Sequence, residues 1–232
     1  MHEHYIVPVL STQWFWGLLF SLIVYGLLLW AGMYAKQNGF EEKYRYFLAG
    51  IFIIREVYLF AYIFQMGQFT VQDSLPLHLC NISYISLIIV LIKPNYFLFE
   101  FILMLGLAGA LQSLITPELT HGYSDYFFLD YYFSHSAIIF VPLYALIVLN
   151  MKPRDRSWLR VFCFGNLVLI AVYCLNLLFN SNYIYLMEAP KANNPLILHP
   201  YPMHLIGFEV FGFLHIVFIY WLSRKYFIPK TI

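Results

Sequence analysis

The chain has 232 residues, of which 62% are hydrophobic and 11% are charged. Soluble domains average about 45–50% apolar and about 25% charged residues, so this composition excludes a water-soluble globular protein. The formal net charge is +1 and the sequence has no basic block, so nothing indicates nucleic-acid binding. The composition predicts an integral membrane protein with a single transmembrane domain over residues 1–232.

Seven apolar segments follow one another, and each has about the 20 residues that a helix needs to cross a bilayer. The predicted spans are residues 13–35, 44–68, 75–92, 96–116, 131–150, 158–180 and 200–226. The first span is too long for a signal peptide and lacks a small-residue cleavage site, so we expect it to be permanent. The predicted fold class is all-α, a polytopic membrane protein built as a seven-transmembrane-helix bundle. Its cysteines, Cys80, Cys163 and Cys174, lie in apolar segments, so no disulfide framework is expected.

The basic residues predict the orientation of the bundle. Of the 13 lysines and arginines, all but Arg55 and Lys191 fall in alternate connections or at the C-terminal end. Cytoplasmic connections carry an excess of Lys and Arg, so the N-terminus is predicted outside and the C-terminus in the cytoplasm. The outer connections then include residues 117–130, which carry Glu118, Asp125 and Asp130.

Polar side chains from five predicted helices reach a similar depth in the outer half of the bilayer. At 1.5 Å per residue, His78 to Asn81 lie about 5–9 Å, and His135 and His204 about 6 Å, below the outer boundary. Polar groups in a membrane usually face a cavity or the protein interior. The candidate residues at this level are His78, Cys80, Asn81, Gln112, His135, Asn176 and His204. Together they predict a cavity open toward the outside. The alternative is that they form hydrogen bonds between helices, and for Gln112 and Asn176 taken singly this is the favoured interpretation.

Arg55 and Glu56 lie near the middle of the second predicted helix. Adjacent residues point about 100° apart on a helix, so we expect Arg55 to pair with Glu209, a mid-membrane acid of the last helix, rather than with Glu56. Such a pair is either architectural or an anchor for a phosphate or carboxylate head group.

A cysteine and a histidine at matching depth indicate acyl transfer, because histidine takes the thiol proton and the thiolate attacks an ester. Cys80 and His135 meet this condition on different helices, although a lone cysteine in a helix is often only a packing residue. On a regular helix His78 faces away from Cys80 and shares a face with Asn81, unless the chain is irregular near Pro76. A zinc site of His78, His135 and His204 is a weaker alternative, and no metal is expected.

Three motifs carry a resemblance to a known family: residues 75–80 (LPLHLC), 109–117 (GALQSLITP) and 132–136 (YFSHS). They resemble the bacterial YwaF-type integral membrane proteins, which are similar to eukaryotic transmembrane protein 164. This resemblance implies a location in the bacterial cytoplasmic membrane and acyl transfer between phospholipids and lysophospholipids by a cysteine and a histidine. The histidine matches His135. The cysteine position between the proline and the histidine of LPLHLC is Leu77 here, and Cys80 lies one helical turn further on.

The sequence thus predicts a membrane-embedded acyltransferase or lipid hydrolase that acts on a lipid of the outer leaflet. His135 is the predicted general base, Cys80 the nucleophile, and His78 with Asn81 the groups that polarise the ester carbonyl. Because the site faces outward, acyl-CoA and ATP cannot reach it. Transacylation or hydrolysis of a lipid needs no cofactor, and the expected partners are membrane lipids. The alternatives are a non-enzymatic protein that binds or transports a small solute or lipid in the same cavity, and a structural protein without a ligand.

Overall fold

A computed structural model describes residues 4–191 and 201–227 and shows a helical fold with one short pair of strands. Residue 200, where the last predicted span begins, and Lys230, one of the basic residues at the predicted cytoplasmic end, lie outside the described residues. The helices are α1 (Thr12–Gln37), α2 (Glu41–Gln65), α3 (Leu79–Ile92), α6 (Asp125–Ile147), α7 (Ser157–Phe179), α8 (Met203–Phe227) and a composite helix. The composite helix consists of α4 (Tyr96–Phe101), the π-helical turn η1 (Ile102–Gly106) and α5 (Leu107–Ile115).

The helices have the surface of a membrane protein. By length and composition, five of them can cross a bilayer: α1, α2, the composite Tyr96–Ile115, α7 and α8. Large apolar side chains stand exposed on their outer faces, including Leu22 at 73%, Ile54 at 70% and Leu178 at 72%. In water such exposure would be unfavourable, and lipid tails are the solvent that suits it. The chain is therefore a helical, multi-pass membrane protein.

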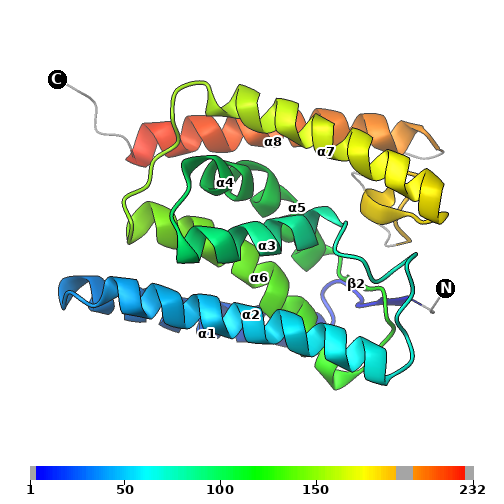
Figure 1. The fold of residues 1–232 in the computed structure, drawn as a ribbon, viewed down its shortest axis with the longest axis horizontal. Helices are drawn as coiled ribbons and strands as arrows, with labels where there is room; N and C mark the ends of the chain where they lie inside the picture. The colour runs from blue at the N-terminus through cyan, green and yellow to red at the C-terminus, as the bar shows by residue number, and fades with distance from the viewer. Residues whose placement is uncertain (1–3, 192–200, 228–232) are drawn as a thin grey trace.

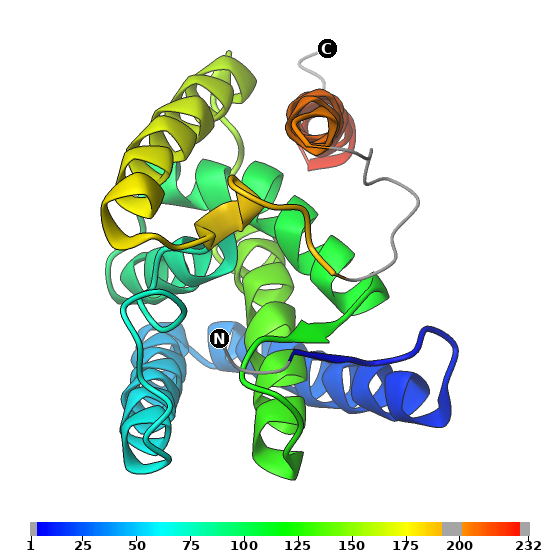
Figure 2. The same cartoon turned by 90° about the vertical axis from the view of Figure 1, so that its right-hand side faces the viewer.

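The helices alternate in direction, so their connections gather at two ends of the bundle (Figure 1). The N-terminal strand β1 (Tyr5–Ile6), the α2–α3 connection, the strand β2 (Glu118–Leu119) and the described residues after α7 lie at one end, and Figure 2 views the molecule from there. The α1–α2, α3–α4 and α6–α7 connections and the C-terminal end of α8 lie at the other. This second end carries the basic residues that predicted a cytoplasmic face.

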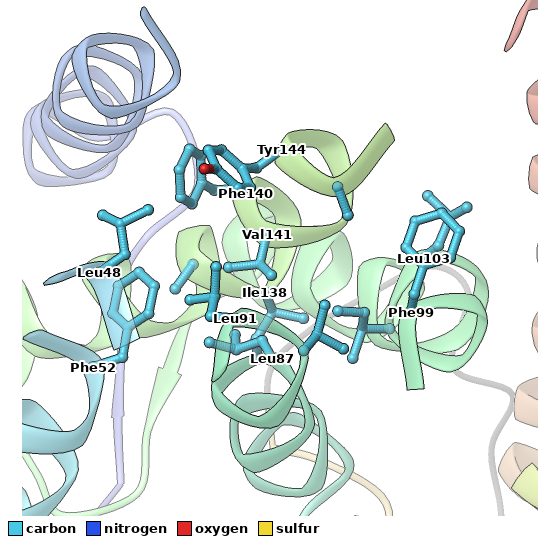
Figure 3. Packing of buried hydrophobic residues seen from close by; sticks show 14 of the residues in the cluster. Leu48, Phe52, Leu87, Leu91, Phe99, Leu103, Ile138, Phe140, Val141 and Tyr144 are labelled. Atoms are coloured by element: carbon cyan, nitrogen blue, oxygen red, sulfur yellow. The ribbon is translucent and has the colours of Figure 1, made fainter. Parts of the chain in front are cut away.

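Helix α6 forms the centre of the main apolar core. Leu48 and Phe52 of α2, Leu87 of α3 and Leu103 of η1 are buried against it. Figure 3 shows these side chains around Ile138, Phe140, Val141 and Tyr144 of α6. Because α6 lies inside and α1, α2, α7 and α8 face outward, polar side chains of α6 such as Ser134 and Ser136 are buried in protein.

Small residues let α1 approach α6 closely. A Cβ added to Gly17 would lie 2.3 Å from Cζ of the buried Tyr132. Further along α1, the Tyr25 hydroxyl donates to the Phe133 carbonyl at 2.7 Å. These contacts fix the face that α6 turns toward α1.

Two helix starts differ from the predicted spans, and both differences matter for the site. Helix α6 begins at Asp125, not Tyr131, because Ser124 caps it by accepting from the Phe127 amide at 3.1 Å. Asp130 therefore lies in a helix and not in a loop. Helix α3 begins at Leu79, not Leu75, because Pro76 disfavours helical backbone before it and the Leu75 amide donates to the Tyr183 hydroxyl instead.

A two-stranded sheet covers the end of the bundle that holds the N-terminus. The strands β1 (Tyr5–Ile6) and β2 (Glu118–Leu119) pair antiparallel. The Val7 amide extends the pairing by donating to the Pro117 carbonyl at 3.0 Å, and Val7 is fully buried. The N-terminal segment is thereby fastened to the connection between α5 and α6.

Candidate functional site

A cavity of about 190 Å³ lies among α2, α3, α5 and α6 and the connections at the end of the bundle that holds the N-terminus. Its lining is mixed, with apolar side chains such as Leu59, Ile63 and Phe127 beside many polar ones. The polar lining residues are Arg55, Asp73, Ser74, His78, Cys80, Asn81, Tyr84, Ser113, Glu118, Thr120, His121, Asp130, Tyr131, Ser134, His135 and Tyr185. Five of them were predicted site residues: Arg55, His78, Cys80, Asn81 and His135.

His135 is held in one orientation by its own helix. Its Nδ1 lies 2.8 Å from the backbone carbonyl of Tyr131, one turn earlier in α6. A carbonyl only accepts, so in the neutral ring Nδ1 carries the hydrogen and Nε2 keeps its lone pair. The Tyr131 ring lies against the imidazole, with 4.1 Å between centroids. His135 is thus arranged as a proton acceptor in the cavity.

His78 is held in the opposite tautomer. It is the last residue before α3 and has extended backbone, with ψ 149°. Its Nδ1 lies 3.2 Å from the backbone nitrogen of Ile184, which can only donate, so the hydrogen of the neutral ring sits on Nε2. The rings of Tyr183 and Tyr185 flank it at 5.2 and 5.6 Å between centroids. His78 therefore offers a hydrogen-bond donor where His135 offers an acceptor.

Cys80 and His78 both line the cavity, which a regular helix would not allow. Residues 75–78 are not helical, so the chain is irregular near Pro76, which is the condition under which His78 and Cys80 can face the same cavity. The Cys80 sulfur lies 3.8 Å from the Ser113 hydroxyl oxygen of α5. Among the described residues no hydrogen bond joins Cys80 directly to His135. Leu77, the position of the cysteine in the family pattern, packs instead against an apolar cluster that includes Val172 and Tyr183.

Arg55 is neutralised by two carboxylates. Its Nε donates to Asp130 Oδ1 at 2.6 Å, its Nη2 donates to Asp130 Oδ2, and its Nη1 donates to Glu56 Oε2 at 2.7 Å. The predicted Arg55–Glu209 pair is wrong, because Glu209 accepts from the Asn166 amide at 2.9 Å. The expectation that Arg55 pairs poorly with the adjacent Glu56 was wrong too, since the long arginine side chain reaches the neighbouring carboxylate. Every guanidinium nitrogen is engaged, which disfavours a role as a phosphate anchor.

The other predicted site residues lie outside the cavity. Asn176 is buried and accepts from the Tyr183 amide at 2.9 Å, and His204 is buried with Nε2 2.9 Å from the Tyr185 carbonyl. Gln112 is exposed on α5, and Glu209 belongs to the contact between α7 and α8. None of these four residues lines the cavity, and the buried hydrogen bonds of Asn176 match the structural role that the sequence favoured for it.

Sequence reasoning missed several polar residues of the cavity. Asp130 was assigned to a loop, although its spacing of five from His135 is compatible with one helix. Tyr131 lies one turn before His135, which is the signal that could have identified it as the partner of Nδ1. Ser113 lies within the GALQSLITP motif. Glu118 lines the cavity while its carboxylate oxygen lies 2.6 Å from His4 Nδ1, so it also fastens the N-terminal segment.

The three histidines of the alternative zinc site, His78, His135 and His204, do not come together in the structure. Across residues 4–191 and 201–227, no group of three His, Cys, Asp or Glu side chains is placed to hold a metal ion. His204 lies outside the cavity that His78 and His135 share.

The connection after α7 is strained where it meets the cavity. Ile184 and Tyr185 have φ of 57° and 54°, a left-handed conformation that costs about 1–3 kcal/mol for a non-glycine residue. The Tyr183 hydroxyl donates to the Val71 carbonyl at 2.7 Å, and burial raises the pKa of Tyr183 to about 12, so this hydroxyl stays protonated. The turn is thus fastened to the α2–α3 connection beside His78.

Comparison with known proteins agrees with the motifs. A model of the TMEM164 family matches residues 9–220, which includes every residue that lines the cavity and ends within α8. No curated protein and no solved structure matches the chain. The match covers well over half of the sequence, and the chain therefore belongs to the TMEM164 family.

Proposed function

We propose that this protein is a membrane-embedded acyltransferase or lipid hydrolase with a Cys–His site in the cavity. The observation that carries the proposal is the pairing of two oppositely fixed histidines, His135 as acceptor and His78 as donor, in one cavity with the Cys80 thiol. Acyl transfer needs these three functions: a base, a nucleophile and a donor toward the developing oxyanion. Membership of the TMEM164 family agrees with a membrane protein of this kind.

The first half-reaction forms a thioester. His135 Nε2 takes the thiol proton of Cys80, and the sulfur attacks the carbonyl carbon of a lipid ester. The carbonyl oxygen becomes an oxyanion that accepts from His78 Nε2–H and from the Asn81 side-chain amide. When the tetrahedral intermediate collapses, the C–O bond to the glycerol oxygen breaks, and that oxygen takes the proton from His135.

The second half-reaction releases the acyl group. The hydroxyl of a lysolipid, or water, gives its proton to His135 Nε2 and attacks the thioester carbonyl. The C–S bond then breaks, and the thiolate of Cys80 recovers its proton from His135. A lysolipid acceptor gives a new phospholipid and water gives a free fatty acid, and neither route requires a cofactor.

The orientation predicted from the basic residues points to the outer leaflet as the source of the substrate. We propose that the cavity lies on the outer side of a bacterial cytoplasmic membrane, as in the YwaF-type proteins that the motifs resemble, because the basic residues gather at the opposite end of the bundle. Acyl-CoA and ATP are absent from that side, so the acyl donor is a lipid already in the outer leaflet. The cavity volume of about 190 Å³ is smaller than most pockets that enclose a drug-sized ligand, and it suits the ester region rather than a complete lipid.

Transfer of a labelled acyl chain tests the proposal. Purified protein in phospholipid vesicles is given a lysophospholipid acceptor, and mass spectrometry follows the labelled phospholipid, lysophospholipid and fatty acid. We expect transfer or hydrolysis with the wild type, and at least a 100-fold loss with His135→Ala and with Cys80→Ala. Cys174→Ala is the matched control, because Cys174 is an exposed cysteine of α7 and should leave the rate unchanged. Equal rates for the wild type and His135→Ala would refute the proposed site.

A non-enzymatic lipid- or solute-binding protein is the second candidate. It is favoured by the contact of Cys80 with Ser113 rather than with His135. In the same vesicles this candidate predicts a ligand that co-purifies with the wild type, is lost from His78→Ala, and is not converted.

A further inference from the structure

His78 owes its orientation to a short turn after α7 and not to its own helix. The turn, η2 (Tyr183–Tyr185), brings the Ile184 amide to within 3.2 Å of His78 Nδ1. Because this amide donates, it disfavours a hydrogen on Nδ1 and keeps the Nε2–H tautomer. The position of one backbone amide therefore decides what His78 offers to the cavity.

The turn has a conformation that its residues would not adopt alone. Ile184 and Tyr185 both have positive φ, and a β-branched isoleucine there is a true outlier. Such strain persists only where surrounding contacts enforce it, and it gathers at functional sites. The contacts that enforce it are therefore part of the arrangement at His78.

Two buried side chains from neighbouring helices enforce the turn. Asn176 of α7 accepts from the Tyr183 amide at 2.9 Å and donates to the Tyr183 carbonyl at 2.9 Å, so its side chain bonds both backbone polar groups of that residue. His204 of α8 donates through Nε2 to the Tyr185 carbonyl at 2.9 Å. Asn176 and His204 are 1% and 0% exposed. They bond the residues directly before and after Ile184, so together they fix the position of the Ile184 amide.

We propose that Asn176 and His204 are positioning residues that act through the Tyr183–Tyr185 turn to hold His78 as the Nε2–H donor of the site. This inference rests on the proposed acyl-transfer function for its catalytic meaning. Its structural content, the tautomer of His78, does not depend on turnover. It gives a function to two polar residues that lie outside the cavity.

Variants of His204 separate positioning from a general loss of structure. His204→Ala removes the donor to the Tyr185 carbonyl, whereas His204→Gln supplies an amide donor in its place. Asn176→Ala removes both contacts with Tyr183, and His215→Ala, a histidine of α8 outside the cavity lining, is the matched control. Thermal unfolding in detergent shows which variants remain folded.

The first readout is the tautomer of His78. Protein labelled with ¹⁵N at histidine is studied by NMR through the two-bond couplings of the ring, with His78→Gln to assign the signal. We expect a pure Nε2–H tautomer in the wild type, His204→Gln and His215→Ala, and a mixture in His204→Ala and Asn176→Ala. A pure Nε2–H tautomer in folded His204→Ala and Asn176→Ala would overturn the inference, whether or not the protein proves to be an enzyme.

The second readout is acyl transfer in the vesicle assay. Loss of one oxyanion donor lowers kcat by about 10²–10³, so partial misplacement of His78 should lower it about 10-fold with little change in KM. We expect this loss in His204→Ala and Asn176→Ala, and recovery to within about threefold in His204→Gln. If His135→Ala abolishes transfer while His204→Ala and Asn176→Ala keep the wild-type kcat, the inference fails and the proposed function stands. If His135→Ala has no effect, the proposed function fails and the NMR result alone decides the inference.

Discussion

Arg55 of α2 and Asp130 of α6 form a two-pronged ion pair beside the cavity, with the arginine Nε and Nη2 each donating to one carboxylate oxygen. Their side chains are only 14% and 9% exposed, and Glu56 accepts from the remaining terminal nitrogen. The Arg55 guanidinium carbon also lies 4.7 Å from the centroid of the Tyr84 ring. This cluster joins α2, α3 and α6 at the depth where the site residues lie.

Breaking the Arg55–Asp130 pair should destabilise the protein strongly. Asp130→Ala leaves a buried guanidinium with one carboxylate fewer, and Arg55→Ala leaves two buried carboxylates unpaired. Each should cost about 3–5 kcal/mol, whereas the double variant Arg55→Leu, Asp130→Leu should cost less than the sum of the two single changes. Unfolding in detergent micelles measures this.

The exposed Arg224–Asp155 pair at the other end of the bundle is the control, and Arg224→Ala should cost about 1 kcal/mol or less. A loss below about 1 kcal/mol in Asp130→Ala would show that the buried pair contributes no more than an exposed one.

The packing of α1 on α6 predicts a large difference between two glycines of one helix. Gly17→Ala places a methyl group 2.3 Å from the Tyr132 ring and should cost about 1–3 kcal/mol, because the buried ring has to move. Gly26→Ala meets no atom within 4 Å and should be neutral or stabilising by up to about 1 kcal/mol, since alanine favours helix. The melting temperatures of both variants provide the comparison. Equal effects would mean that α1 does not pack on α6 through Gly17.

At the basic end of the bundle, removing Arg154 should destabilise the protein more than neutralising its partner Glu100. Its buried carboxylate accepts from the Arg154 backbone amide at 2.7 Å and from the Arg154 side chain at 2.9 and 2.7 Å. Arg154→Ala leaves this carboxylate without its main partner and should cost about 3–5 kcal/mol. Glu100→Gln keeps an acceptor and should cost about 1–2 kcal/mol. Chemical denaturation tests the order, with the exposed Arg156→Ala as control; a reversed order would contradict the burial of Glu100.

Cysteine labelling tests which end faces outward. In a variant without native cysteines, Gln72→Cys lies on the α2–α3 connection and Lys93→Cys on the α3–α4 connection, and both positions are exposed. A membrane-impermeant maleimide added to intact cells should label Gln72→Cys, and should label Lys93→Cys only after permeabilisation. The opposite pattern would place the cavity on the cytoplasmic side.

Much of the fold could be predicted from the sequence, because lipid as the solvent imposes length and charge rules. Six of the predicted spans begin within a few residues of a helix, and the basic residues do gather at one end. The start of α6 was missed because Asp125 and Asp130 look like loop residues when their partners are unknown. Only the tertiary fold shows Arg55 opposite Asp130.

The candidate site could be predicted in part. His78, Cys80, Asn81 and His135 line one cavity, and His78 and Cys80 do so together only because the segment before α3 is irregular, which the sequence allowed as the exception to regular helix geometry. Gln112 follows the π-helical turn η1, which the sequence did not predict, and its side chain is exposed on α5. Asn176 and His204 bind the turn after α7, which no periodicity could indicate.

The most direct test of the acyl-transfer site is detection of the covalent intermediate on Cys80. The protein is mixed with a phospholipid that carries a labelled acyl chain, quenched in acid, digested and examined by mass spectrometry. We expect the labelled acyl group on the Cys80 peptide, removable by hydroxylamine, and much reduced in His135→Ala. Acyl transfer by the wild type with an unmodified Cys80 peptide at every time point, and with the full rate retained by Cys80→Ala, would contradict this expectation.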